Sequence, residues 1–147
     1  MESSVALGQK LLLIGGTLSL IASFLHIGVI VGGPDWYRFF GAGEDMARMA
    51  EKGLVYPAII TLGIALLLAV WAYFAFAGAG LGWKPPLMRT GLIVISGIYL
   101  LRGLALFPLL VFAPDKVNGF AVWSSMIVLV YGLFYAVGTW KAWSSLS

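Results

Sequence analysis

The chain contains no cysteine and a single histidine, His26. The absence of cysteine excludes disulfides, thiolate catalysis, cysteine-bound zinc and covalently attached haem. One imidazole cannot build a histidine metal cluster within one chain, so we expect no metal site and no cofactor. The sequence also lacks a phosphate-binding loop, a dinucleotide-binding glycine fingerprint and a nucleophile elbow, which leaves no motif for the common enzyme classes.

Charged residues are also few in this chain. Only 10% of the residues are charged and 61% are hydrophobic, whereas soluble domains carry about 25% charged residues. This composition indicates an integral membrane protein. The sequence has no basic stripe of the kind that binds nucleic acid, so we expect no nucleic-acid partner.

Four apolar stretches are long enough to cross a bilayer, which takes roughly 20 residues each. They cover approximately residues 11–31, 54–76, 89–112 and 120–140. Because they use most of the 147 residues, we expect one domain over residues 1–147. Irregular backbone cannot face lipid, and the second and third connections are short. The sequence therefore predicts an all-α, polytopic membrane protein with four transmembrane helices in an up-down-up-down bundle.

The first connection, residues 32–53, is the only long one. It opens with two glycines and a proline that end the first helix, and a segment with four aromatic residues and one arginine follows at 36–40. Residues 44–52 read as a short amphipathic helix, on which Glu44 can pair with Arg48 and Arg48 with Glu51. We expect this helix to lie on the membrane surface or to cap the bundle.

Orientation and location follow from weaker signals. The first apolar stretch is too long for the core of a signal peptide, so we expect it to be retained as a span. Lysine and arginine are balanced between the two sides, but nearly all acids lie on the side of the first connection, which favours cytoplasmic N- and C-termini. The layout resembles that of small bacterial inner-membrane proteins with four helices, and the resemblance implies the inner membrane.

Arg102 is the most informative single residue, because it lies inside the apolar run 92–112. A charge near the membrane midplane costs roughly 2.5–3.5 kcal/mol on insertion scales and marks a functional-site hypothesis. No predicted span carries an aspartate or glutamate, so its partner must be a loop, a backbone carbonyl, a lipid or a ligand. Pro108 follows six residues later and predicts a kink, since it cannot donate to the carbonyl of Leu104.

His26 and Arg102 are both displaced towards the acid-rich side of their spans, where the first connection could cover them. We therefore predict a ligand-binding or buried polar cluster, made of Arg102, His26, Tyr99, Asp35, Glu44 and Asp45. Two interpretations of Arg102 are open, a structural link or contact with headgroups, and the binding of an anionic substrate or lipid. His26 is either a neutral histidine that donates to a serine or carbonyl on a neighbouring helix, or part of a proton relay.

Small and hydroxyl-bearing residues recur on one face of the predicted helices. Such residues let membrane helices approach closely and form hydrogen bonds across the interface. The residues that we assign to helix packing are Ser19, Ser23, Ser96, Gly103 and Gly132.

The functional hypothesis that best fits these features is a non-enzymatic accessory or self-associating membrane component, with a polar pocket around Arg102 that accommodates a lipid or an anion. Its expected partners are membrane lipids and copies of itself, or a larger membrane complex. The first alternative is a transporter or channel component for a small anion or amphiphile. The second is an enzyme acting on a lipid or quinone-like substrate, with His26 as acid or base and Arg102 as electrostatic stabiliser.

Overall fold

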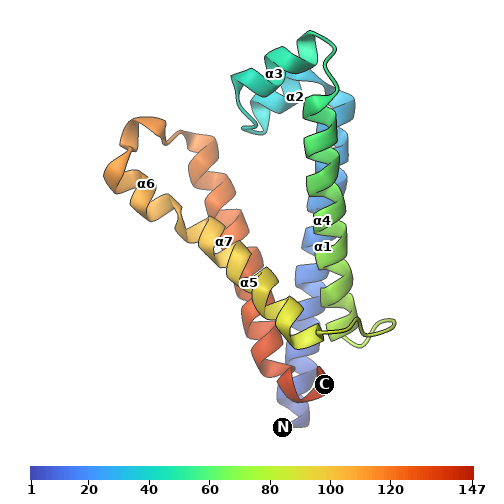
Figure 1. Cartoon of the computed structure of the whole chain (residues 1–147). Coiled ribbons are helices and arrows are strands. Elements are labelled where there is room, and N and C mark those ends of the chain that lie inside the picture. Colours follow the sequence, from blue (N-terminus) through green and yellow to red (C-terminus); the bar gives the residue numbers. More distant parts are fainter. The chain divides into compact units, whose positions relative to one another are not determined.

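The computed structural model describes residues 1–147 and is 83% helical with no strands (Figure 1). Four helical segments are long and apolar enough to cross a membrane. They are α1 (Glu2–Gly32), α4 (Tyr56–Gly78), α5 (Met88–Leu104) continued by α6 (Leu106–Phe112), and α7 (Gly119–Lys141). The predicted fold class, an all-α protein with four transmembrane helices, is confirmed.

The first helix begins earlier than predicted, at Glu2 rather than near residue 11. Residues 2–10 include glutamate, serine, glutamine and lysine, so a hydropathy criterion leaves them outside the span. They contain no proline, and Glu2 in the first turn favours a helix N-terminus electrostatically. Helix formation therefore extends beyond the apolar stretch.

The third span is interrupted at Ala105, between α5 and α6. Ala105 N–H still donates to Leu101 O at 2.9 Å, and Leu109 N–H donates to Ala105 O at 3.3 Å. Pro108 has no N–H to donate to the carbonyl of Leu104, and its ring crowds that carbonyl. The interruption thus lies one turn before the proline at which the sequence predicts a kink.

The first connection contains two short helices, α2 (Pro34–Phe39) and α3 (Glu44–Glu51). Helix α3 confirms the predicted amphipathic helix, whereas α2 was not predicted. Pro34 occupies the start of α2, where a missing N–H costs nothing, and Asp35 lies in the first turn. Gly33 precedes them with φ 74°, a backbone conformation that favours glycine.

Contacts divide the chain into two compact units, and the boundary falls within α1 and α4. The larger unit comprises residues 1–18 and 71–147, and the smaller unit comprises residues 19–70. Each unit is described by itself below. The single domain expected from the sequence stays a prediction.

Helices α5 and α7 form the most extensive contact in the larger unit, and glycines bring them close. A Cβ added to Gly103 would lie 2.8 Å from Leu129 Cα, and one added to Gly132 would lie 2.9 Å from Leu100 N. The later residue of α5 meets the earlier residue of α7, so the two helices are antiparallel. Ser96, also assigned to packing, is buried and donates to Leu92 O of its own helix at 2.6 Å.

The start of α1 and the end of α4 complete the larger unit. A Cβ on Gly8 would meet Ala142 N, one on Gly16 would meet Ala75 Cβ at 3.1 Å, and one on Gly91 would meet the ring of Phe74. Further along the same helices, a Cβ on Gly138 would meet Leu12, and one on Gly78 would meet Leu12 and Met88. In each pair of helices the residue numbers rise on one helix as they fall on the other. The larger unit therefore shows the alternating direction expected of an up-down-up-down arrangement.

In the smaller unit, Ser23 Oγ of α1 donates to Ala65 O of α4 at 2.6 Å. Ser19 is buried on α1, one turn before Ser23. Helices α2 and α3 pack on the end of α1 through a small core of Val29, Tyr37 and Ala47. This core holds both short helices against one end of a membrane span.

Candidate functional site

Arg102 lies near the end of α5 and contacts two neighbouring serines of α7. Its Nη1 donates to Ser125 Oγ at 3.1 Å, and its Nη2 donates to Ser124 Oγ at 3.5 Å. Ser125 is buried and Ser124 is half-buried, whereas Arg102 itself is exposed. The guanidinium is therefore held by neutral hydroxyl groups and remains open on its other side.

The depth of Arg102 can be read from α7. Trp123 precedes the two serines directly and has 68% of its surface exposed, as Trp140 does at 74%. The two tryptophans are 17 residues apart, about 26 Å along a helix and close to the roughly 30 Å thickness of the hydrocarbon core. Because exposed tryptophans favour the membrane–water interface, we expect Arg102 to lie nearer to one interface than to the midplane.

The electrostatic surroundings of Arg102 favour an anion. None of the ion pairs in the structure involves Arg102. Asp115, the nearest acid along the chain, is exposed in the 3₁₀ turn η1 (Pro114–Lys116) and makes no ion pair either. We call Arg102, Ser124 and Ser125 the Arg102 site.

His26 belongs to the smaller unit and makes a local contact. Its Nδ1 donates to Ala22 O, four residues earlier on α1, at 2.7 Å. This bond assigns the Nδ1–H tautomer to the neutral ring. The acceptor belongs to the same helix and not to a neighbouring one, so both interpretations of His26 stay predictions.

Tyr99 lies in the larger unit, among aromatic rings rather than acids. Its ring centroid is 4.9 Å from that of Trp71, 5.3 Å from that of Tyr135 and 5.7 Å from that of Tyr131. The cluster predicted from the sequence draws on residues of both units: Arg102 and Tyr99 on one side, and His26, Asp35, Glu44 and Asp45 on the other. Its assembly stays a prediction.

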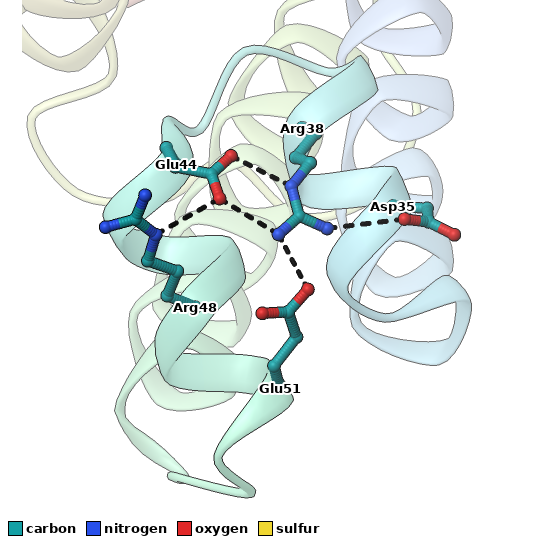
Figure 2. Close-up of polar contacts among 5 residues, drawn as sticks. All are labelled: Asp35, Arg38, Glu44, Arg48 and Glu51. Atoms are coloured by element: carbon teal, nitrogen blue, oxygen red, sulfur yellow. Dashed lines mark hydrogen bonds and ion pairs between the residues drawn. The ribbon is translucent and has the colours of Figure 1, made fainter.

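The charged centre of the smaller unit is Arg38, which the sequence analysis did not single out (Figure 2). Its Nε and Nη2 donate to the two carboxylate oxygens of Glu44 at 2.9 and 3.0 Å. The same Nη2 donates to Glu51 Oε1 at 2.6 Å, and Nη1 reaches Asp35 Oδ1 at 3.4 Å. One guanidinium thus holds three carboxylates and ties α2 to α3; we call this group the Arg38 clasp.

The Arg38 clasp engages two of the acids that the sequence assigns to the Arg102 cluster, Asp35 and Glu44. Glu44 also accepts from Arg48 Nε at 3.3 Å, as the spacing of four residues predicts. The expected partner of Arg48, Glu51, pairs with Arg38 instead. Asp45 is exposed and makes no ion pair.

The clasp shifts the protonation equilibria of its members. Hydrogen bonds from Arg38, and to a smaller extent from Arg48, lower the pKa of the Glu44 carboxyl below its usual 4.5. The hydrogen bonds to Glu44 and Glu51 raise the pKa of Arg38, which therefore stays charged throughout the accessible range. The direction of each shift means that the clasp is formed by the ionised carboxylate.

We expect acidification to weaken the attachment of α2 to α3, because it protonates Glu44. A carboxyl with a lowered pKa in the folded state stabilises that state above its unfolded pKa, near 4.5, and loses this contribution as the pH falls through the folded value. Amide hydrogen exchange in residues 33–53, corrected for the intrinsic effect of pH, should therefore accelerate as the pH falls below about 4.5, the usual pKa of the carboxyl.

The matched control is Glu44→Gln, which removes the titrating group. Its exchange in residues 33–53 should be faster than that of the wild type at pH 6 and should change less on acidification. Equal acid sensitivity in the two proteins would show that the Arg38–Glu44 contact does not hold α2 to α3.

Comparison of the chain with protein-family models, with curated proteins and with solved structures finds no match.

Proposed function

We propose that this chain is a small, non-enzymatic integral membrane protein that holds the phosphate of a phospholipid at Arg102. The observation that carries the proposal is a guanidinium that contacts two serine hydroxyls and pairs with no carboxylate. The exposed Trp123 beside these serines supports a position near the headgroups. A guanidinium donates several N–H groups in one plane and suits phosphate oxygens well. Serine hydroxyls can rotate to donate to the same anion.

An accessory or self-associating role is the second part of the proposal. The connections after α4 and after α6 are short, so little of the chain is available to partners outside the membrane. The spans expose many large apolar side chains, including Leu101, Phe107 and Val111. Lateral contact through these faces, with lipids, further copies or a larger membrane complex, is the natural mode of association.

We also propose that the protein lies in a bacterial inner membrane, with its N- and C-termini in the cytoplasm. The layout of four spans and the concentration of acids in the first connection support it.

Native mass spectrometry of the full chain, released gently from its membrane, tests the lipid site. We expect the wild type to retain one more phospholipid per chain than Arg102→Gln, because the amide cannot neutralise a phosphate. Lys116→Gln is the matched control, since Lys116 is a cation in η1 whose side chain forms no hydrogen bond with Ser124 or Ser125. It should retain the same lipids as the wild type.

Two outcomes would contradict the proposal. Equal lipid retention by the wild type and Arg102→Gln, with helix content unchanged by circular dichroism, would exclude a lipid phosphate at Arg102. Anion flux in proteoliposomes that disappears in Arg102→Gln would replace the accessory role by transport.

A further inference from the structure

A second basic site lies at the other end of α5. A cavity of about 290 Å³ opens between the connection from α4 to α5, the first turn of α5 and the last residues of the chain. Its polar lining comes from Lys84, Arg89, Thr90 and Ser147, and its apolar lining includes Leu87 and Leu146. All of these residues belong to the larger unit. We call it the basic cavity.

Two cations of the basic cavity are held in place by carbonyl groups. Lys84 Nζ donates to Ser145 O at 2.5 Å and to Ser147 O at 3.3 Å. Arg89 Nη2 donates to Trp143 O at 3.0 Å, and its guanidinium carbon lies 4.7 Å from the centre of the Trp143 ring. Neither cation pairs with an aspartate or glutamate side chain. Two basic side chains, each bonded to main-chain oxygen atoms, therefore line the cavity.

Arg89 also has a donor that no protein group satisfies. Its Nε is buried and has no hydrogen-bond acceptor within the chain. A buried N–H without an acceptor costs free energy. An anion that enters the cavity and draws the guanidinium of Arg89 towards it would give this donor an acceptor.

The backbone around the cavity adds to its positive character. Helix α5 begins at Met88, and its N-cap residue Leu87 provides no side-chain hydrogen bond to the free amides of the first turn. Leu87 has φ 56° and is the only residue other than glycine with a positive φ, a conformation that carries strain in a branched residue. Its side chain is 77% exposed beside the cavity, next to an interfacial Trp83 that is 72% exposed.

From these observations we infer that the basic cavity binds the phosphate of an anionic phospholipid. Lys84 and Arg89 pair with the phosphate, Thr90 can donate its hydroxyl, and Leu87 and Leu146 contact the upper part of the acyl chains. Arg89 and Arg102 are 13 residues apart, about 20 Å along the span, so this lipid belongs to the leaflet opposite the Arg102 lipid. The inference does not depend on Arg102.

Titration of the full chain in detergent with phosphatidylglycerol or phosphatidylcholine, followed by native mass spectrometry, tests the basic cavity. We expect Lys84→Gln/Arg89→Gln to bind its first phosphatidylglycerol at least tenfold more weakly than the wild type does. Lys141→Gln is the matched control, because Lys141 is a cation at the same end that does not line the cavity. It should bind phosphatidylglycerol as the wild type does, and unchanged binding by the double variant would overturn the inference.

Two further measurements settle the source of the phosphate and guard against misfolding. Inorganic phosphate at millimolar concentration should not displace phosphatidylglycerol; displacement would reassign the cavity to a free phosphate. A photoreactive group attached to the phosphatidylglycerol headgroup should label residues 84–90 or 143–147 of the unaltered protein. Labelling confined to other segments would overturn the inference even if the double variant fails to fold.

Discussion

Gly103→Val is expected to destabilise the larger unit by about 1–3 kcal/mol or more, the range for overpacking a closely packed interior. A Cβ at position 103 would lie 2.8 Å from Leu129 Cα and 2.9 Å from Leu129 N. These are backbone atoms, so no side-chain rotation can relieve the clash and α7 must move away from α5. Unfolding in mixed detergent micelles, followed by circular dichroism, should show the loss as a lower denaturant midpoint.

The matched control for Gly103→Val is Gly97→Ala. Gly97 lies in the same helix, and a Cβ there would meet nothing within 4 Å. Alanine should leave stability unchanged or raise it by about 0.5–1 kcal/mol, since glycine loses more backbone freedom in a helix. If both substitutions changed the midpoint equally, the close approach of α5 and α7 at Gly103 would not limit stability.

The same close approach explains why the partners of Arg102 could not be predicted from the sequence. In sequence, Arg102 lies inside an unbroken apolar run, and no span carries an acid. In the structure, the antiparallel register of α5 and α7 sets Arg102 beside Ser124 and Ser125, next to Trp123. The contacts of Arg102 thus depend on the register of two helices, which hydropathy does not encode.

The ion pairs of Glu44 and Glu51 were likewise only partly predictable from the sequence. The sequence indicates correctly that residues 44–51 form a helix and that Glu44 pairs with Arg48. It does not reveal α2, because six residues are too few for a periodic pattern. Without α2 there is no reason to bring Arg38 to Glu51, 13 residues away in the chain. The proline at the start of α2 and the acid in its first turn are the only local signals.

By contrast, the four spans follow from elementary physics. Backbone groups in hydrocarbon must be satisfied internally, so an apolar stretch of sufficient length has no alternative to a helix. The short connections then fix neighbouring helices as antiparallel. These constraints act on whole segments and tolerate errors of several residues at each end, as the early start of α1 shows.

Substitution of Tyr135 is also expected to lower stability strongly, because Tyr135 is fully buried in the larger unit. Its hydroxyl donates to Trp71 O of α4 at 3.0 Å, and its ring contacts Tyr99 of α5, so it joins three helices. Tyr135→Ala should cost about 3 kcal/mol, the lower end of the range for large-to-small core substitutions, because lipid rather than water solvates the separated helices. Tyr135→Phe removes only the hydroxyl and should cost about 1 kcal/mol.

The difference between the two Tyr135 variants separates ring packing from hydrogen bonding. Tyr131→Phe is the control, since Tyr131 also contacts the Tyr99 ring but is only half-buried and donates no hydrogen bond across the helices. Its denaturant midpoint should match that of the wild type. A Tyr135→Phe variant as unstable as Tyr135→Ala would assign the stabilisation to the bond with Trp71 O. A Tyr135→Ala variant as stable as the wild type would show that these three helices are held together by other contacts, above all the glycine contacts between α5 and α7.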